Sequence, residues 1–203
     1  THVYFARPDS SGQGGGDSIF RVGHAGGTVT RLYTSAPIRF GESGGGFALG
    51  AQFLAFGSGG TVSRGPIAGG TRTTFSRTAT GPRDFFFVGD TLYLDAMIQN
   101  RPGLHSSTDG ITATHITSFA GPYAADETNA YFISGNGQTR VSKYALDGSD
   151  AQPVQLALVA GEEHAAVARH GEWLYLRGPS LTRVKIADGT IETVVPSSAG
   201  SIV

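Results

Sequence analysis

Acidic, imidazole, guanidinium and phenol groups occur where several predicted β-strands begin. They are Arg83, Asp84, Tyr123, Glu163 and His164. Carboxylates and an imidazole can hold a cation or exchange protons with a substrate, and an arginine can bind an anion. If the fold gathers these residues, they form a polar binding site. The alternative is a hydrated surface on which the same groups only satisfy strand ends.

A second set of polar residues lies in three long segments, 6–18, 34–46 and 96–104. Long irregular loops on a rigid β-scaffold usually carry function. The candidate binding residues in these loops are Arg7, Asp9, Arg39, Glu42, Gln99, Asn100 and Arg101. For the Gly/Ser-rich stretch 10–16, a flexible spacer is the alternative.

Several other kinds of chemistry have no signal in the sequence. Because the chain has no cysteine, it has no disulfide, thiolate metal site or cysteine nucleophile. GSGG (57–60) lacks the lysine and the helix of a phosphate-binding loop. We therefore assign no catalytic residue and predict no cofactor, and we leave open whether a cation is bound.

The composition also limits the partners. The net charge is −1 and both signs are mixed along the chain, so no basic stripe could neutralise several phosphates. We expect no nucleic-acid partner. No apolar run approaches the roughly 20 residues that span a bilayer, so we expect no membrane insertion. The chain begins at Thr1 with neither Met nor a signal-like segment, which predicts a processed or trimmed product.

A repeat of about 40 residues must position these groups. Each unit carries a Gly-Gly or Asp-Gly turn, which supplies the positive φ of a tight hairpin. The second glycines of these turns are Gly27, Gly70, Gly110, Gly148 and Gly189. An apolar strand lies about 20 residues before each turn, as in a propeller blade, at 3–6, 53–56, 92–96, 130–133 and 173–176. A third strand precedes each turn and a Thr- or Val-rich fourth strand follows it.

We therefore predict an all-β fold, a five-bladed β-propeller with four-stranded antiparallel blades. The first unit lacks its opening strand, and SAGSIV (198–203) could supply it, so that the C-terminal strand pairs with the N-terminal blade and closes the ring. The single domain 1–203 then divides into blade 1 (198–203 with 1–35), blade 2 (44–78), blade 3 (82–118), blade 4 (121–159) and blade 5 (162–196). The alternative is a fragment of a larger ring.

Two segments carry a family resemblance. TNAYFISG…TRVSKYALDG (128–148) and THVYFAR…SIFRVGHAGGTVTRL (1–32) resemble the TN-V-Y-W…G-x-V-x-K-x-x-L-D-G-G repeats of secreted bacterial β-propellers, akin to the YWTD and NHL classes. Blades 1, 4 and 5 match best, whereas blades 2 and 3 lose the consensus residues. The resemblance implies a secreted or envelope-facing bacterial recognition module. It carries no catalytic residue across.

In such a ring, the residues that enter the innermost strands surround the channel mouth, on the same face as the long loops. The sequence thus favours a non-catalytic, monomeric recognition module that binds a protein or a glycan through this face. The loops do not repeat from blade to blade, which argues against a multivalent lectin. One alternative is a hydrolase or lyase in which Asp84 or Glu163 is the general acid or base, assisted by His164 and Arg83. Another is a structural domain of a larger surface protein, whether natural, excised or engineered.

Two structural roles are also expected. Asp90 and Asp126 occupy hairpin turns, where an aspartate commonly caps its own backbone. The aromatic residues of the apolar strands are expected to pack between blades, namely Tyr93, Tyr131, Phe132, Trp173 and Tyr175.

Overall fold

The computed structural model describes residues 2–8, 17–34, 46–58, 61–75, 84–119, 121–135, 137–150 and 152–196. These residues form β-strands and turns, and no helix among them could span a membrane. The chain divides into two compact units, Thr1–Ser118 and Phe119–Val203.

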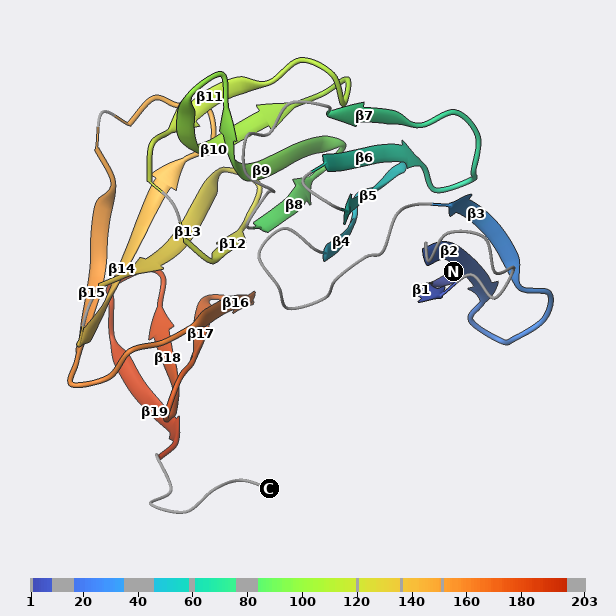
Figure 1. The fold of residues 1–203 in the computed structure, drawn as a ribbon. Coiled ribbons are helices and arrows are strands. Elements are labelled where there is room, and N and C mark those ends of the chain that lie inside the picture. The colour runs from blue at the N-terminus through green and yellow to red at the C-terminus, as the bar shows by residue number, and fades with distance from the viewer. Residues whose placement is uncertain are drawn as a thin grey trace. The chain divides into compact units, whose positions relative to one another are not determined.

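The first unit contains three antiparallel sheets whose strands follow one another in chain order (Figure 1). Sheet 1 consists of β1 (His2–Pro8), β2 (Asp17–Gly23) and β3 (Thr30–Thr34). Sheet 2 consists of β4 (Gly46–Leu49), β5 (Phe53–Ser58), β6 (Thr61–Pro66) and β7 (Thr73–Phe75). Sheet 3 consists of β8 (Asp84–Val88), β9 (Thr91–Ile98), β10 (Arg101–Ser107) and β11 (Thr114–Thr117).

The second unit contains two four-stranded sheets of the same kind. Sheet 4 consists of β12 (Tyr123–Ala125), β13 (Asn129–Ser134), β14 (Gln138–Ala145) and β15 (Val154–Ala160). Sheet 5 consists of β16 (Ala166–His170), β17 (Trp173–Arg177), β18 (Leu181–Lys185) and β19 (Ile191–Val195). Every pairing within the two sheets is antiparallel.

Alternating burial explains why these sequences form strands. Along β18, Thr182 and Val184 are buried while their neighbours are only half-buried, the period of two that a strand with one face on a core requires. Sheets 4 and 5 bury one apolar cluster between them. Its members are Tyr131, Ile133, Val141, Ala157, Val159, Leu174, Leu176 and Val184. Burying each large side chain contributes about 1.5–3 kcal/mol, so this cluster holds the two sheets together.

Sheet 2 is buried on both faces. Leu54 and Phe56 of β5 pack with Ile19 and Tyr33 of sheet 1. Between them in sequence, Ala55 belongs to the cluster formed with sheet 3. Successive side chains of a strand point to opposite faces, so one strand contributes to both cores.

The predicted segment 96–104 is not a long loop, and that expectation is wrong. β9 continues to Ile98 and β10 starts at Arg101, so only two residues connect them. Gln99 and Asn100 have φ values of 52° and 62°, which gives a tight hairpin turn without glycine. Pro102 and Gly103 discourage a strand in the sequence, yet the pairing with β9 runs through both of them.

The main features of the predicted fold agree with the structure: an all-β chain of short antiparallel strands, with four-stranded sheets. The predicted hairpin turns are also present, as Gly148 and Gly189 show with φ values of 75° at both. The proposed closing strand, 198–203, lies outside the described residues. Closure of a five-bladed ring and the blade boundaries therefore stay predictions.

Candidate functional site

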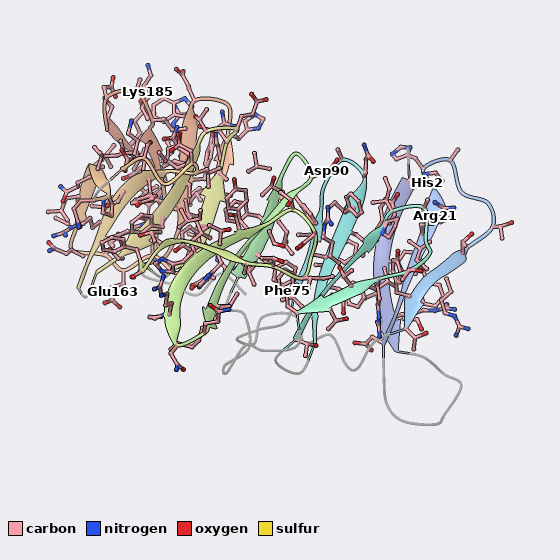
Figure 2. The ribbon with its side chains drawn as sticks, turned by 90° about the horizontal axis from the view of Figure 1, so that it is seen from above. His2, Arg21, Phe75, Asp90, Glu163 and Lys185 are labelled. Atoms are coloured by element: carbon pink, nitrogen blue, oxygen red, sulfur yellow. The ribbon has the colours of Figure 1, made fainter. Side chains whose placement is uncertain are left out.

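The two ends of the second unit differ in which connections they carry. The links β13–β14, β15–β16 and β17–β18 lie at one end, which we call the loop end. The remaining hairpins lie at the opposite end, which we call the turn end. Figure 2 shows Glu163 at the loop end and Lys185 at the turn end. The polar residues predicted for binding in this unit belong to the loop end.

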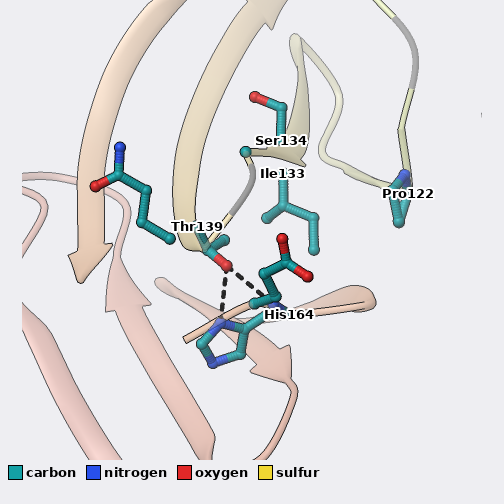
Figure 3. A pocket seen from close by; sticks show the side chains of 8 residues that line it. Pro122, Ile133, Ser134, Thr139 and His164 are labelled. Carbon is teal, nitrogen blue, oxygen red and sulfur yellow. Dashed lines mark hydrogen bonds between the residues drawn. The ribbon is translucent and has the colours of Figure 1, made fainter. Parts of the chain in front are cut away.

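A cavity of about 170 Å³ opens at the loop end, between sheet 4 and the connection that enters sheet 5 (Figure 3). Its lining residues are Pro122, Ile133, Ser134, Gly135, Gln138, Thr139, Glu163 and His164. Ile133 and Pro122 make part of the wall apolar, whereas Glu163 brings a carboxylate. The cavity thus combines a negative charge with an apolar wall.

Glu163 is an exposed residue whose carboxylate is held by the backbone. Its Oε1 accepts a hydrogen bond from the amide nitrogen of Gly137 at 2.7 Å. The β13–β14 connection reaches this position because Gly135 has a φ of 142°. A Cβ on Gly135 would lie 2.0 Å from the carbonyl oxygen of Gln138, so the tight turn requires glycine. The loop geometry therefore orients the carboxylate.

His164 is fixed by Thr139 from the neighbouring sheet. The backbone nitrogen of His164 donates to Thr139 Oγ1 at 2.9 Å, and the imidazole Nδ1 lies 3.0 Å from the same oxygen. Thr139 Oγ1 also lies within hydrogen-bonding distance of the Glu162 carbonyl, at 3.0 Å. Figure 3 shows these contacts of Thr139 with His164. The imidazole side chain is fully buried, so it acts as a link between sheets.

The other side of the imidazole faces Glu162. Among the described residues, His164 Nε2 has no hydrogen-bond partner, and it lies 3.6 Å from Glu162 Oε2. Ser180 donates to that carboxylate oxygen and lies 2.9 Å from Thr182 Oγ1. Burial lowers the pKa of His164, and the Glu162 carboxylate opposes this shift only in part. A neutral, buried imidazole of this kind is poorly placed to exchange protons with a ligand.

Metal binding has little support within the described residues, where no group of three or more His, Cys, Asp or Glu side chains could hold an ion. What the loop end offers to a ligand is the oriented carboxylate of Glu163 beside a partly apolar wall. Such a site can accept hydrogen bonds and attract a cationic group.

No protein-family model matches the chain, and no curated protein does. Solved structures do match. Nidogen in the nidogen/laminin complex has a TM-score of 0.61 and 17% identity, over 89% of this chain and 72% of that one. BamB from Moraxella catarrhalis has a TM-score of 0.56 and 11% identity, over 94% and 65%. Both are β-propeller proteins.

This chain has a β-propeller type of fold. A puromycin-hydrolysing peptidase of Mycobacterium tuberculosis also matches, with a TM-score of 0.64 and 16% identity, over 96% of this chain but 37% of that one. The propeller described here therefore spans only part of each matched chain. At such low identity these matches establish the fold alone.

Of the predicted channel-mouth residues, Tyr123, Glu163 and His164 all lie at the loop end of the second unit. Glu163 and His164 line the cavity. Tyr123 is buried, and its hydroxyl donates to the carbonyl of Phe119. Asp84 begins β8 in the first unit and accepts a hydrogen bond from the Phe85 nitrogen at 2.9 Å. Its grouping with Glu163 stays a prediction, and Arg83 lies outside the described residues.

The predicted long-loop residues fall into three cases. Arg7 is exposed on β1, with its guanidinium carbon 4.4 Å from the centre of the Phe20 ring. Gln99 and Asn100 form the tight β9–β10 turn, and Arg101 begins β10. The three other candidates lie outside the described residues, namely Asp9, Arg39 and Glu42.

Sequence reasoning missed several residues of the site. The sequence pattern identifies Thr139 only as part of a strand, although a polar residue on the buried face of β14 is a usable signal. Ser180 joins the network through a contact with Glu162 that no local pattern reveals, whereas Glu162 itself stands in the polar run that enters the strand. In the first unit, Asp95 is only 2% exposed and lies opposite Asp84 in the β8–β9 register. The sequence feature that could have identified Asp95 is a charged residue inside an apolar strand.

The expectation that Asp90 and Asp126 cap their own turns is confirmed for Asp126 and wrong for Asp90. Asp126 caps its own turn by accepting hydrogen bonds from the nitrogens of Thr128 and Asn129, both at 2.8 Å. Asp90 instead accepts from the nitrogen of Gln52, at 2.8 Å, and so joins sheet 3 to sheet 2. The β4–β5 turn of sheet 2 lies close enough to donate this hydrogen bond to Asp90.

Some of the aromatic residues expected to pack between blades do so, whereas others pack within one sheet. Tyr131 packs in the core between sheets 4 and 5, as expected. Tyr93 stacks on Phe86 of the adjacent strand, with ring centres 5.4 Å apart. Trp173 is half-buried, and the guanidinium carbon of Arg183 lies 4.1 Å from the centre of its ring. The last two contacts are within a sheet and not between sheets.

Proposed function

We propose that this propeller is a non-catalytic recognition module and that it binds a protein partner through the loop end of its sheets. The observation that carries the proposal is the cavity at that end, with the Glu163 carboxylate oriented by the Gly137 amide. The neighbouring His164 is buried and bound to Thr139. A site with an accessible carboxylate and an inaccessible imidazole is better suited to binding than to proton transfer.

A protein partner fits this site better than a glycan. The cavity of about 170 Å³ is smaller than the roughly 300–1,000 Å³ that hold most small ligands. Sugar-binding propellers would repeat the same pocket in several blades, and the loops of this chain do not repeat. One asymmetric surface for one partner is the simpler reading.

The proposal includes the architecture around the site. We expect a closed five-bladed ring in which 198–203 pairs with β1, acting as a monomer outside the cytoplasm, in the cell envelope or secreted. Propellers of similar fold include nidogen, whose structure was solved in complex with laminin. That likeness supports a binding role for this type of fold and identifies no partner.

The test compares two charge changes at opposite ends of the second unit. The protein, Glu163→Arg and the control Lys185→Glu are immobilised and exposed to the extracellular and envelope fractions of the source organism. Bound proteins are identified by mass spectrometry, and direct binding is then measured with the purified partner. We expect the partner to be retained by Lys185→Glu and lost by Glu163→Arg.

Two outcomes would contradict the proposal. One is a partner that depends on Lys185 and is indifferent to Glu163, which would move the binding surface to the turn end. The other is turnover of a defined substrate that Asp84→Ala or Glu163→Ala abolishes. The second result would establish the hydrolase or lyase alternative.

A further inference from the structure

We infer that the cavity at the loop end is a socket for one lysine side chain of the partner. This inference deepens the proposed function and rests on it. It follows from the size of the cavity, the charge on its wall and the way its carboxylate is already engaged.

Size restricts the ligand to a single side chain. A volume of about 170 Å³ falls below the roughly 300–1,000 Å³ of pockets for drug-sized molecules. A short polar group on a flexible aliphatic stem is the kind of side chain that fits. Binding energy at protein interfaces commonly concentrates in such anchor residues, which fill a small pocket at the centre of the contact.

The wall supplies both parts of a lysine site. Pro122 and the small accessible part of the core residue Ile133 offer apolar surface for the methylene stem. Glu163 offers a carboxylate for the ammonium group, and no Lys or Arg lines the cavity in the part of the chain that the structure describes. Glu162 is taken by Ser180 and faces His164, so Glu163 is the carboxylate directed to a ligand.

The engagement of Glu163 favours lysine over arginine. A guanidinium binds best when both carboxylate oxygens are available for two parallel hydrogen bonds. Here Oε1 already accepts from the Gly137 nitrogen at 2.7 Å. An ammonium group acts as a point charge with three donors and needs only the remaining oxygen, with Ser134 and Gln138 lining the rest of the cavity.

The experiment titrates the whole protein with three blocked amino acids and follows amide signals by NMR. The probes are Nα-acetyl-lysine methylamide, its Nε-acetylated form, and the norleucine analogue, which keeps the stem and lacks the charge. The amide of Gly137 is the reporter, because it donates to Glu163. We expect a saturable shift of this signal with the lysine probe alone.

Two variants make the test specific. Glu163→Gln should weaken lysine binding by roughly 1.4-fold to fivefold, the range for an exposed ion pair. Glu127→Gln removes the same charge from the exposed β12–β13 turn of the same sheet and should leave binding unchanged. Because Glu163 is exposed, its replacement by glutamine should not unfold the protein.

Several results would overturn the inference. They are no shift with the lysine probe, an equal shift with norleucine or Nε-acetyl-lysine, and an affinity for the lysine probe that Glu163→Gln leaves unchanged. If the probe fails while a partner still depends on Glu163, the socket is wrong and the proposed function stands. If the probe binds while no partner depends on Glu163, the proposed function is wrong and the socket stands.

Discussion

Thr139 and His164 hold each other across two sheets, with Thr139 Oγ1 lying 2.9 Å from the backbone nitrogen of His164 and 3.0 Å from its Nδ1. One hydroxyl group thus fixes both the backbone and the ring of a residue 25 positions away. Glu163 is the residue immediately before His164. The orientation of the candidate binding carboxylate therefore depends on this contact.

Replacing Thr139 with valine should test that dependence. The change keeps the approximate shape of the side chain and leaves the backbone nitrogen of His164 and its buried imidazole Nδ1 without their partner. Such unsatisfied groups cost about 1–3 kcal/mol, so we expect a loss of that order in the free energy of unfolding in urea. Thr193→Val on the exposed strand β19 is the matched control and should change stability by less than about 0.5 kcal/mol. Equal effects of the two substitutions would show that the contact is unimportant.

The buried imidazole predicts a pH dependence of stability. Burial lowers the pKa of His164 in the folded protein below its ordinary value of 6.5. The unfolded chain therefore binds more protons than the folded one once the pH falls below about 6.5. The contribution of neutral His164 to the free energy of unfolding should be fully present above that pH. It should decline below that pH by at most about 1.4 kcal/mol per pH unit for one proton.

Urea unfolding at pH 7.5, 6.5, 5.5 and 5.0 measures this slope. His164→Gln should reduce the slope in that range, and the slope that remains is expected from His105, whose pKa is also lowered by burial. His170→Gln, at an exposed residue outside the network, should leave the slope unchanged. A slope that His164→Gln leaves unchanged would assign the effect to other groups.

The strands could be predicted from the sequence because their signals are local. Each apolar run is followed by a glycine turn at a regular interval, and this pattern correctly predicts five strands. VYFA, FLAF, LYLDA, AYFI and WLYL lie in β1, β5, β9, β13 and β17, respectively. The β9–β10 turn escaped prediction because Gln99 and Asn100 adopt positive φ without glycine. Neighbouring strands impose that conformation, and tertiary packing does not appear in a local pattern.

The candidate site could be predicted only in part. Glu163 and His164 can be predicted because they directly precede a strand. The topology of the sheet places residues in this position at one end of the sheet. Their opposite roles could not be foreseen, since they depend on contacts with Gly137 and Thr139 from the neighbouring sheet. Adjacent residues on one connection point to different environments, and only packing decides which is exposed.

The hydrogen bond that Tyr131 donates to Asp126 leads us to expect a loss of stability in acid. Burial raises the pKa of the Asp126 carboxyl group, but hydrogen bonds from Tyr131, Thr128 and Asn129 outweigh it and lower this pKa to about 2. The stabilisation is present above the ordinary value of 3.8 and is lost as the pH falls from about 4 through about 2. Solvent screening at this partly exposed group reduces the effect to about 1 kcal/mol.

Asp126→Asn is the variant that measures this contribution. It should lower stability at pH 5 and narrow its difference from the unmodified protein at pH 2.5, as followed by urea unfolding. Asp147→Asn, in an exposed turn of the same sheet without a tyrosine partner, is a control expected to have a smaller effect. A constant difference between pH 5 and pH 2.5 would mean that the carboxylate of Asp126 does not drive the acid dependence.

Gly65 and Tyr33 predict a steric coupling between sheets 1 and 2. The Tyr33 hydroxyl donates to the Pro66 carbonyl at 2.6 Å, which brings the ring onto the backbone of β6. A Cβ on Gly65 would lie 2.5 Å from both Cζ and Oη of Tyr33. Because Tyr33 is only 5% exposed, its ring cannot simply turn away. Gly65→Ala should cost about 1–3 kcal/mol through overpacking, measured by urea unfolding.

A double-mutant cycle separates this clash from an ordinary cost of replacing glycine. Tyr33→Leu removes the ring, so Gly65→Ala should cost at least about 1 kcal/mol less in that background than in the unmodified protein. Gly70→Ala is the control, since Gly70 has a φ of 122° and nothing lies within 4 Å of the added Cβ. Its cost comes from the backbone alone and should be the same with either residue at position 33. Additive effects of Gly65→Ala and Tyr33→Leu would mean that the two sheets are not packed through this pair.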